Sequence, residues 1–178
     1  MIKLLESKVK HFSDVDRQCV LLMDKKSVKK GLRYCKMRDL VVGYVDNGTE
    51  RKPEVATSAL VFMIRGIFQH WKQAVSFSFT TDSLQSSEVK QLIVQIFTAL
   101  QKTGLKIIGI VSDQGSTFPK MFREWGVSSS QPYVNISGNR FLVFPDPPHL
   151  LKNKRNMLFH NDVVHAGGTA TWCYINFF

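Results

Sequence analysis

The chain has 178 residues and a mass of 20.3 kDa, enough for one domain or for one domain with a piece of a second. Its 44% hydrophobic and 21% charged residues exclude a disordered chain, and no apolar run can span a bilayer, so no membrane partner is expected. The 24 basic and 14 acidic residues give a net charge of +10. That charge points to a polyanionic partner, usually nucleic acid, with a merely basic soluble protein as the alternative.

The first part of the chain is predicted to contain strands. Residues 1–13 show a weak helical pattern and no core signal, so we expect them to be the tail of an upstream segment. The apolar run Cys19–Met23 predicts a buried central strand that ends at Asp24. Two further strands are predicted at Leu32–Tyr34 and Leu40–Tyr44, and an Asp-Asn-Gly turn closes the second.

Helices and strands are expected to alternate from residue 53 onward. Pro53-Glu54 is typical of the first turn of a helix, and apolar residues recur at helical spacing as far as Trp71. The later elements are expected in the order strand, helix, strand, short helix, strand and helix, at Ala74–Phe79, Ser86–Gly104, Leu105–Val111, Ser116–Gly126, Phe141–Phe144 and Leu150 onward. This order predicts an α/β fold with a mixed sheet flanked by helices.

Two aspartates, Asp24 and Asp113, follow apolar strands. If the two strands are neighbours, both carboxylates lie at the carboxyl edge of the sheet and converge. A divalent cation removes the repulsion between converging carboxylates, and hard oxygen ligands suit Mg²⁺ or Mn²⁺, which can activate a water or a 3′-hydroxyl at a phosphodiester. Asp82 also follows a predicted strand and competes with Asp113 on this pattern. The alternative is that these are ordinary turn aspartates.

Basic residues form two clusters. The first has seven positive charges and no acid within fourteen residues, and its members are Lys25, Lys26, Lys29, Lys30, Arg33, Lys36 and Arg38. The second consists of Lys152, Lys154 and Arg155. Both are candidates for contacts with nucleic-acid phosphates, and a solvated surface is the alternative for each. The three cysteines are widely spaced and form no metal or disulfide motif, which indicates a reducing compartment.

Four segments together resemble the P-element family of DNA transposases, which includes the THAP-type transposases. They are Cys19–Asp24, Ala56–Gly66, Val111–Ser116 and Phe144–Asn153. The most specific part is the string Asp-Pro-Pro-His-Leu-Leu-Lys-Asn in the last segment. The resemblance runs from about Lys8 to the C-terminus and implies an RNase H-like fold that cuts and rejoins DNA. It also makes the predicted helix at Pro53–Trp71 an insertion into the minimal RNase H order.

The resemblance assigns roles to the candidate residues. It implies that Asp24 is the first catalytic acid and Asp113 the second, with Mg²⁺ or Mn²⁺ bound between them. The family interrupts its RNase H-like fold with a GTP-binding domain near the Pro-Pro-His motif, and its third acid, a glutamate, follows that insertion. We therefore expect an upstream tail, an RNase H-like domain and the start of the GTP-binding insertion at 1–13, 14–150 and 151–178.

The same resemblance implies transposon ends and target DNA as partners, a homo-oligomer of the full-length protein and nuclear localisation. The chain departs from the family pattern beside the first acid, where Lys25-Lys26 replace the usual Glu-Met and add positive charge. The third acid is expected to be absent, and so are the elements that would complete the fold, which would leave one apolar face exposed.

We interpret the chain as a fragment of a P-element-like transposase. The complete protein would catalyse Mg²⁺-dependent phosphodiester hydrolysis and strand transfer, and the fragment alone would be inactive. The alternative is a non-catalytic DNA-binding or interaction remnant of a domesticated or decayed transposon, in which the basic surface matters and the aspartates do not. For Asp146 and His149 we favour a rigid Pro-Pro turn with Asp146 as helix cap over a motif that positions DNA or nucleotide.

Overall fold

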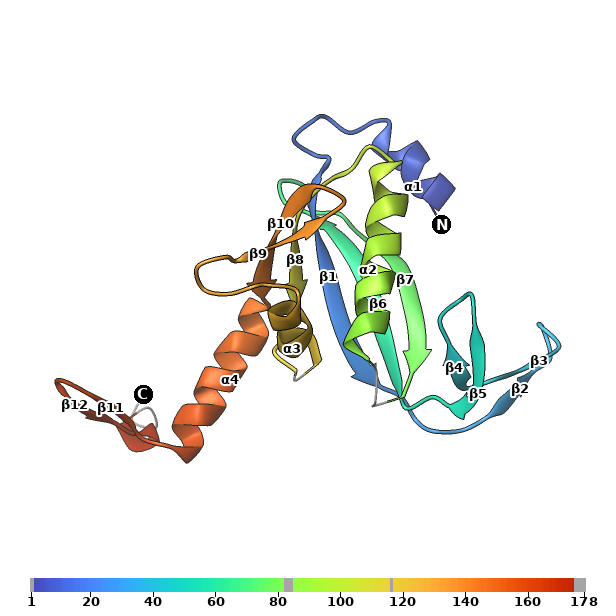
Figure 1. The fold of residues 1–178 in the computed structure, drawn as a ribbon. Helices are drawn as coiled ribbons and strands as arrows, with labels where there is room; N and C mark the ends of the chain where they lie inside the picture. Colours follow the sequence, from blue (N-terminus) through green and yellow to red (C-terminus); the bar gives the residue numbers. More distant parts are fainter. Residues whose placement is uncertain (1, 82–84, 116, 175–178) are drawn as a thin grey trace.

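A computed structural model describes residues 2–81, 85–115 and 117–174 of the chain (Figure 1). The strands of its main sheet are β1 (Gln18–Ser27), β4 (Tyr44–Asp46), β5 (Arg51–Val55), β6 (Ser58–Gly66), β7 (Lys72–Thr80), β8 (Lys106–Ser112), β9 (Tyr133–Ile136) and β10 (Asn139–Pro145). They lie in the order β5-β4-β7-β6-β1-β8-β10-β9. Two hairpins lie outside this sheet, β2 (Arg33–Cys35) with β3 (Leu40–Val42) and β11 (Val163–His165) with β12 (Gly168–Ala170).

The sheet combines an antiparallel part and a parallel part. β1 pairs antiparallel with β6, which pairs antiparallel with β7. On its other side β1 pairs parallel with β8, and β8 pairs parallel with β10. Cys19, Leu21 and Met23 of β1 are buried, in alternation with half-buried residues. The predicted mixed α/β sheet and the position of β1 at its centre are therefore confirmed.

Helix α2 (Ser86–Gln101) covers one face of the sheet (Figure 1). Its buried side chains form a stripe at helical spacing: Val89, Ile93, Ile96, Phe97 and Leu100. They belong to the same core cluster as Leu21 and Phe62 of the strands. Burial of each such side chain stabilises the fold by about 1.5–3 kcal/mol. The predicted helix is confirmed, although the residue that caps it is Gln85 rather than Ser86.

The N-terminal helix α1 (Ile2–Val9) is part of the domain core. Its Leu5 and Val9 are only 3% and 2% exposed and join the core cluster. Phe12 then packs on Trp71, with ring centroids 5.2 Å apart. The expectation that residues 1–13 carry no core residue is wrong. It failed because α1 has only eight residues, and its two buried positions are a single turn apart.

The predicted helix at Pro53–Trp71 is wrong, and so is its interpretation as an insertion. The segment forms β5 and β6, and β6 pairs with both β1 and β7. Every second residue of β6, from Ser58 to Gly66, is buried, which is the period of a strand. The intervening residues are also largely apolar, so the sequence of this segment also matches the period of a helix. The aromatic and β-branched residues of the run favour the strand.

Most of the other predicted elements are confirmed. The predicted strands at Ala74–Phe79, Leu105–Val111 and Phe141–Phe144 correspond to β7, β8 and β10, and the helix expected from Leu150 is α4 (Pro147–His160). The short helix α3 (Thr117–Glu124) lies where one was expected, while its predicted cap, Ser116, lies outside the described residues. The sequence reasoning missed β9, a four-residue strand at the edge of the sheet.

The segment between residues 40 and 51 is divided by turns. The predicted strand Leu40–Tyr44 is split into β3 and β4 at Gly43, whose φ is +111°. A Cβ atom at Gly43 would lie 2.1 Å from the Gly31 carbonyl oxygen, so only glycine fits there. The predicted turn after β4 is confirmed, since the Gly48 N–H donates to Asp46 Oδ1 at 2.8 Å.

The face of the sheet opposite α2 carries exposed apolar side chains. Phe77 and Phe79 of β7 are 55% and 36% exposed, and Leu142 and Phe144 of β10 are 41% and 42% exposed. The residues between them, such as Ser78, point to the core. The expected exposure of an apolar face is thus confirmed for the described part of the chain. No helix within that part is long and apolar enough to cross a membrane.

Candidate functional site

The two candidate aspartates lie at the ends of paired stretches of neighbouring parallel strands. The pairing of β1 with β8 starts at Gln18 opposite Lys106, and after a bulge it runs from Val20 opposite Gly109 to Met23 opposite Ser112. Asp24 is the next residue of β1 and Asp113 directly follows β8, so both lie at the same edge of the sheet, where β8 ends. The two strands are therefore neighbours, which was the condition for the Asp24 and Asp113 carboxylates to converge. The prediction that the strand ends at Asp24 is wrong, because β1 continues to Ser27 in its pairing with β6.

A third carboxylate follows the next parallel strand. Pro145 of β10 pairs with Ser112, and Asp146 comes directly after it. The Asp146 N–H donates to the Ser112 carbonyl at 2.8 Å. The Asp146 carboxylate accepts from the His149 N–H at 3.4 Å and is the N-cap of α4. The interpretation of Asp146 as the cap that starts the next helix is therefore confirmed, with Pro147 and Pro148 in the first turn of α4.

The Asp24 carboxylate already has a cationic neighbour. Lys26 Nζ lies 3.1 Å from Asp24 Oδ2, and the two residues point to the same face because they are two apart on one strand. The side chains are 67% and 42% exposed, so the ion pair contributes at most about 1 kcal/mol to stability. Any metal ion that binds Asp24 must compete with the Lys26 ammonium group.

The Asp113 carboxylate is held by its own loop. Its Oδ1 atom accepts from the Gly115 N–H at 3.0 Å, which closes a short Asx turn. A Cβ atom at residue 115 would lie 3.1 Å from Oδ1 and 3.4 Å from Oδ2, so glycine allows the carboxylate to sit close to the backbone. Ser112 Oγ donates to the Asp113 carbonyl at 3.2 Å. The turn therefore fixes the direction of the carboxylate before any ligand binds.

These two residues fit a hard divalent cation held partly by the protein. Carboxylate oxygens are the ligands that Mg²⁺ prefers, and Mg²⁺ usually takes one or two carboxylates together with waters and substrate phosphates. Among the described residues no group of three or more His, Cys, Asp or Glu side chains is placed to hold a metal ion. The donor set of Asp24 and Asp113 thus suits a site completed by water and phosphate. Asp82, the competing candidate, lies outside the described residues.

The predicted basic residues lie on both sides of this sheet edge. Lys25 and Lys26 are in the last part of β1, and Lys29 and Lys30 are exposed in the segment that leads to β2. On the other side, α4 leaves the end of β10 and carries the second cluster (Figure 1). That cluster is Lys152, Lys154 and Arg155, all exposed. Positive charge therefore flanks the two carboxylates.

Sequence reasoning missed a link between the Asp113 loop and α4. Asn153 Nδ2 donates to Gln114 Oε1 at 2.9 Å, across 39 positions in the chain. Both residues lie in the segments with family resemblance, which was a signal that they matter. Neither periodicity nor spacing could show that the two side chains meet, because the contact depends on β8 and β10 being parallel neighbours.

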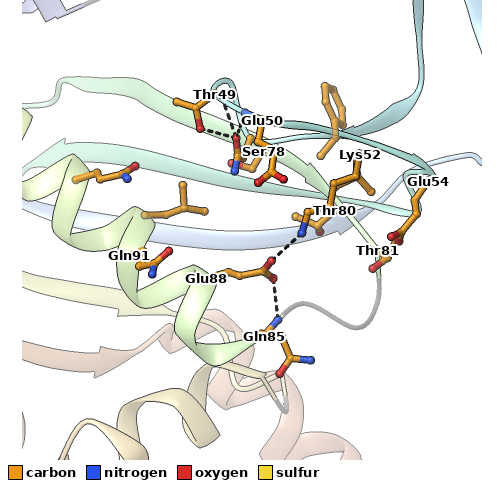
Figure 2. A pocket seen from close by; sticks show the side chains of 15 residues that line it. Thr49, Glu50, Lys52, Glu54, Ser78, Thr80, Thr81, Gln85, Glu88 and Gln91 are labelled. Atoms are coloured by element: carbon orange, nitrogen blue, oxygen red, sulfur yellow. Dashed lines mark hydrogen bonds and ion pairs between the residues drawn. The ribbon is translucent and has the colours of Figure 1, made fainter.

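A separate polar cavity of about 330 Å³ lies between α2 and the β4–β5 hairpin (Figure 2). Lys52 Nζ lies 3.2 Å from Glu88 Oε1, and the Gln85 N–H donates to Glu88 Oε2 at 3.2 Å. The neighbouring Glu88 carboxylate raises the pKa of Lys52. Ser78 Oγ and Thr80 Oγ1 are buried and have no hydrogen-bond partner in the described part of the chain. None of the predicted site residues lines this cavity.

Comparison with known proteins decides the family. Residues 1–126 match the family model described as TNP-like, RNase H N-terminal domain. The chain belongs to this family. The Transposable element P transposase of Drosophila melanogaster is 29% identical to this TNP-like RNase H chain over 165 residues. The matched residues cover 89% of the present chain. The solved Drosophila P element transposase strand transfer complex matches with a TM-score of 0.77 and 25% identity over 97% of the chain. The predicted RNase H-like fold and P-element resemblance are confirmed.

The relatives are much longer than this TNP-like RNase H chain. It spans 19% of the length of the Drosophila transposase and 37% of the chain in the solved complex. The family model ends at residue 126, so β10, α4 and everything after them lie beyond its match. The catalytic roles of Asp24 and Asp113, the metal, and the expected GTP-binding insertion at 151–178 remain predictions.

Proposed function

We propose that this chain is the part of a P-element-like transposase that supplies two acids, Asp24 and Asp113, to a Mg²⁺ or Mn²⁺ site for phosphodiester hydrolysis and strand transfer. The observation that carries the proposal is the parallel register of β1 and β8, which sets Asp24 and Asp113 at the same sheet edge. When bound, the cation would act as a Lewis acid and lower the pKa of a bound water or hydroxyl. The relationship to P element transposase supports this chemistry.

The chain's own residues would then orient the metal and the DNA. The Asx turn at Gly115 holds the Asp113 carboxylate in a fixed direction, and β1 places Asp24 on a paired strand rather than on a loop. A cation at Asp24 would release the Lys26 ammonium group, which could then pair with a DNA phosphate. The exposed lysines after β1 and the basic residues of α4 would add contacts with the phosphate backbone on either side.

DNA is the proposed partner, as transposon ends and as target DNA. The net charge of +10 and the two flanking basic clusters support this partner, and the structural relative is a strand transfer complex. Nuclear localisation and assembly of the full-length protein into an oligomer follow from the same proposal. GTP would bind in full-length relatives, through the insertion expected from residue 151.

We further propose that the chain alone does not cut DNA efficiently. The resemblance implies a third acid, a glutamate that follows the GTP-binding insertion, whereas the proposed metal site consists of Asp24 and Asp113 and the Asp146 carboxylate caps α4. Removal of one metal ligand usually removes most activity, because the metal geometry depends on all of its ligands. The isolated chain should therefore bind metal and DNA without rapid turnover.

A second candidate function rests on the Lys26–Asp24 ion pair. If Lys26 permanently neutralises Asp24, the edge of the sheet is a basic surface for DNA and not a metal site. The chain would then act as a non-catalytic DNA-binding remnant of a transposon. The two candidates differ in whether a divalent cation strengthens DNA binding through Asp24 and Asp113.

Fluorescence anisotropy with a short labelled duplex, with and without Mg²⁺ at constant ionic strength, separates the two candidates. The metal-site proposal predicts that Mg²⁺ tightens DNA binding by the wild type and not by Asp24→Ala or Asp113→Ala. Asp162→Ala is the matched control, because Asp162 is exposed and follows the end of α4 that is farther along the chain from β10. Weakening of DNA binding by Mg²⁺ to the same degree in all four proteins would support the remnant and contradict the proposal.

A further inference from the structure

Helix α4 is attached to the domain through its first two turns. None of its described residues is buried. Its N-cap Asp146 donates its backbone N–H to the Ser112 carbonyl at 2.8 Å, and about two turns further on Asn153 Nδ2 donates to Gln114 Oε1 at 2.9 Å. The helix and its cap are therefore hydrogen-bonded to the residues on either side of Asp113, which are Ser112 and Gln114.

The second of these bonds acts on the turn that orients the carboxylate. Gln114 is the central residue of the Asx turn in which the Gly115 N–H donates to Asp113 Oδ1 at 3.0 Å. The loop after β8 is exposed at Gln114 and Gly115, so few packing contacts restrain it. Any rotation of the backbone at Gln114 moves the Gly115 N–H and with it the Asp113 carboxylate. A hydrogen bond that fixes the Gln114 side chain limits this rotation.

We infer that Asn153 is a positioning residue that acts through Gln114 to hold the Asp113 carboxylate in its metal-binding direction. The inference deepens the proposed function and rests on it. Asn153 lies in α4, beyond the residues that match the RNase H family model. The metal affinity of Asp113 thus depends on the placement of a helix outside that match.

Calorimetric titration of the purified chain with Mn²⁺ tests the inference. The variants are Asn153→Ala, Asn153→Leu, Gln114→Ala and the double variant Asn153→Ala with Gln114→Ala. Asn156→Ala is the matched control, because Asn156 lies on the same helix and bonds to its neighbour Arg155 rather than to the loop. Hydrogen exchange of the Gly115 amide is a second measurement, because it reports the turn directly.

The expected result is a rise of about two- to tenfold in the Mn²⁺ dissociation constant of each single variant, the range that loss of one hydrogen bond can produce. The double variant should match the single variants, since both remove the same bond. The Gly115 amide should exchange faster, Asn156→Ala should behave as the wild type, and the thermal midpoints should stay close together because the bond is on the surface. A role for Asn153 in stability alone would lower the thermal midpoint and leave the Mn²⁺ affinity unchanged.

Two results would overturn the inference in distinguishable ways. If the wild type binds Mn²⁺, Asp113→Ala abolishes the binding, and the Asn153 variants bind as the wild type does, the inference is wrong while the proposed function stands. If the folded wild type, as judged by circular dichroism, does not bind Mn²⁺ at all, the proposed metal site is wrong, and the inference falls with it. Additive effects in the double variant would also contradict it, because they would mean that the two residues act independently.

Discussion

Replacement of Lys26 by alanine should strengthen metal binding at Asp24. Lys26 Nζ lies 3.1 Å from Asp24 Oδ2, and a bound Mg²⁺ or Mn²⁺ would contact the same carboxylate. Because the lysine side chain is 67% exposed, the ion pair contributes about 0.2–1 kcal/mol. Removal of this ion pair should therefore tighten metal binding about 1.4- to fivefold. Repulsion between a divalent cation and an ammonium group that stays near adds on the order of 1 kcal/mol in water. Together the two contributions give about 1.2–2 kcal/mol, so we expect a total gain of about eight- to thirtyfold.

The assay is a Mn²⁺ titration of wild type, Lys26→Ala and Lys30→Ala by calorimetry. Lys30 is exposed and lies beyond the end of β1, so its removal changes the net charge equally without freeing Asp24. The gain for Lys26→Ala should shrink when the ionic strength rises from about 0.05 M to about 0.5 M, because salt screens exposed charges. Equal gains for both variants would refute the reasoning, since they would show a general charge effect. Weaker binding by Lys26→Ala would refute it as well.

Three further predictions concern the Asp113 turn, a thiol and the core. Gly115→Ala should weaken Mn²⁺ binding several-fold with little change in thermal midpoint, since the added Cβ would lie 3.1 Å from Asp113 Oδ1, and calorimetry would show it. Burial raises the pKa of Cys19 to about 12, so this thiol should resist alkylation at pH 8 while the other two cysteines react, as mass spectrometry of the labelled chain can check. Phe62→Ala should lower the free energy of unfolding by about 3–5 kcal/mol in urea titrations, because Phe62 is 0% exposed, whereas Phe77→Ala on the open face should change it by less than about 1 kcal/mol.

The sequence predicted the placement of Asp24 and Asp113 better than it predicted the antiparallel half of the fold. Asp24 and Asp113 follow short apolar runs that suit buried strands, and their shared position at the carboxyl ends of these strands follows from the general rule for α/β folds. The prediction of a helix in the β6 segment failed because apolar residues occupy both faces of that strand, so the helix and strand periods fit equally well. Pairing with β1 and β7 decides between them, and that pairing is a long-range property that no local window contains.

Contacts between distant segments were also beyond reach of the sequence. Asn153 and Gln114 meet only because β10 lies beside β8 in parallel. The Lys26–Asp24 pair, by contrast, follows from two positions on the same strand and was open to prediction once Asp24 was placed on β1. The core role of α1 was missed because two buried residues, Leu5 and Val9, give too weak a periodic signal.

The central claim is that Asp24 and Asp113 form one divalent-cation site. Its most direct test is calorimetric titration of the folded chain with Mn²⁺, with Asp24→Ala, Asp113→Ala and the control Asp162→Ala measured beside it. We expect one saturable site in the wild type and in the control, and loss of that site in each of the other two variants. A folded wild type that shows no site, or a site that survives both substitutions, would contradict it.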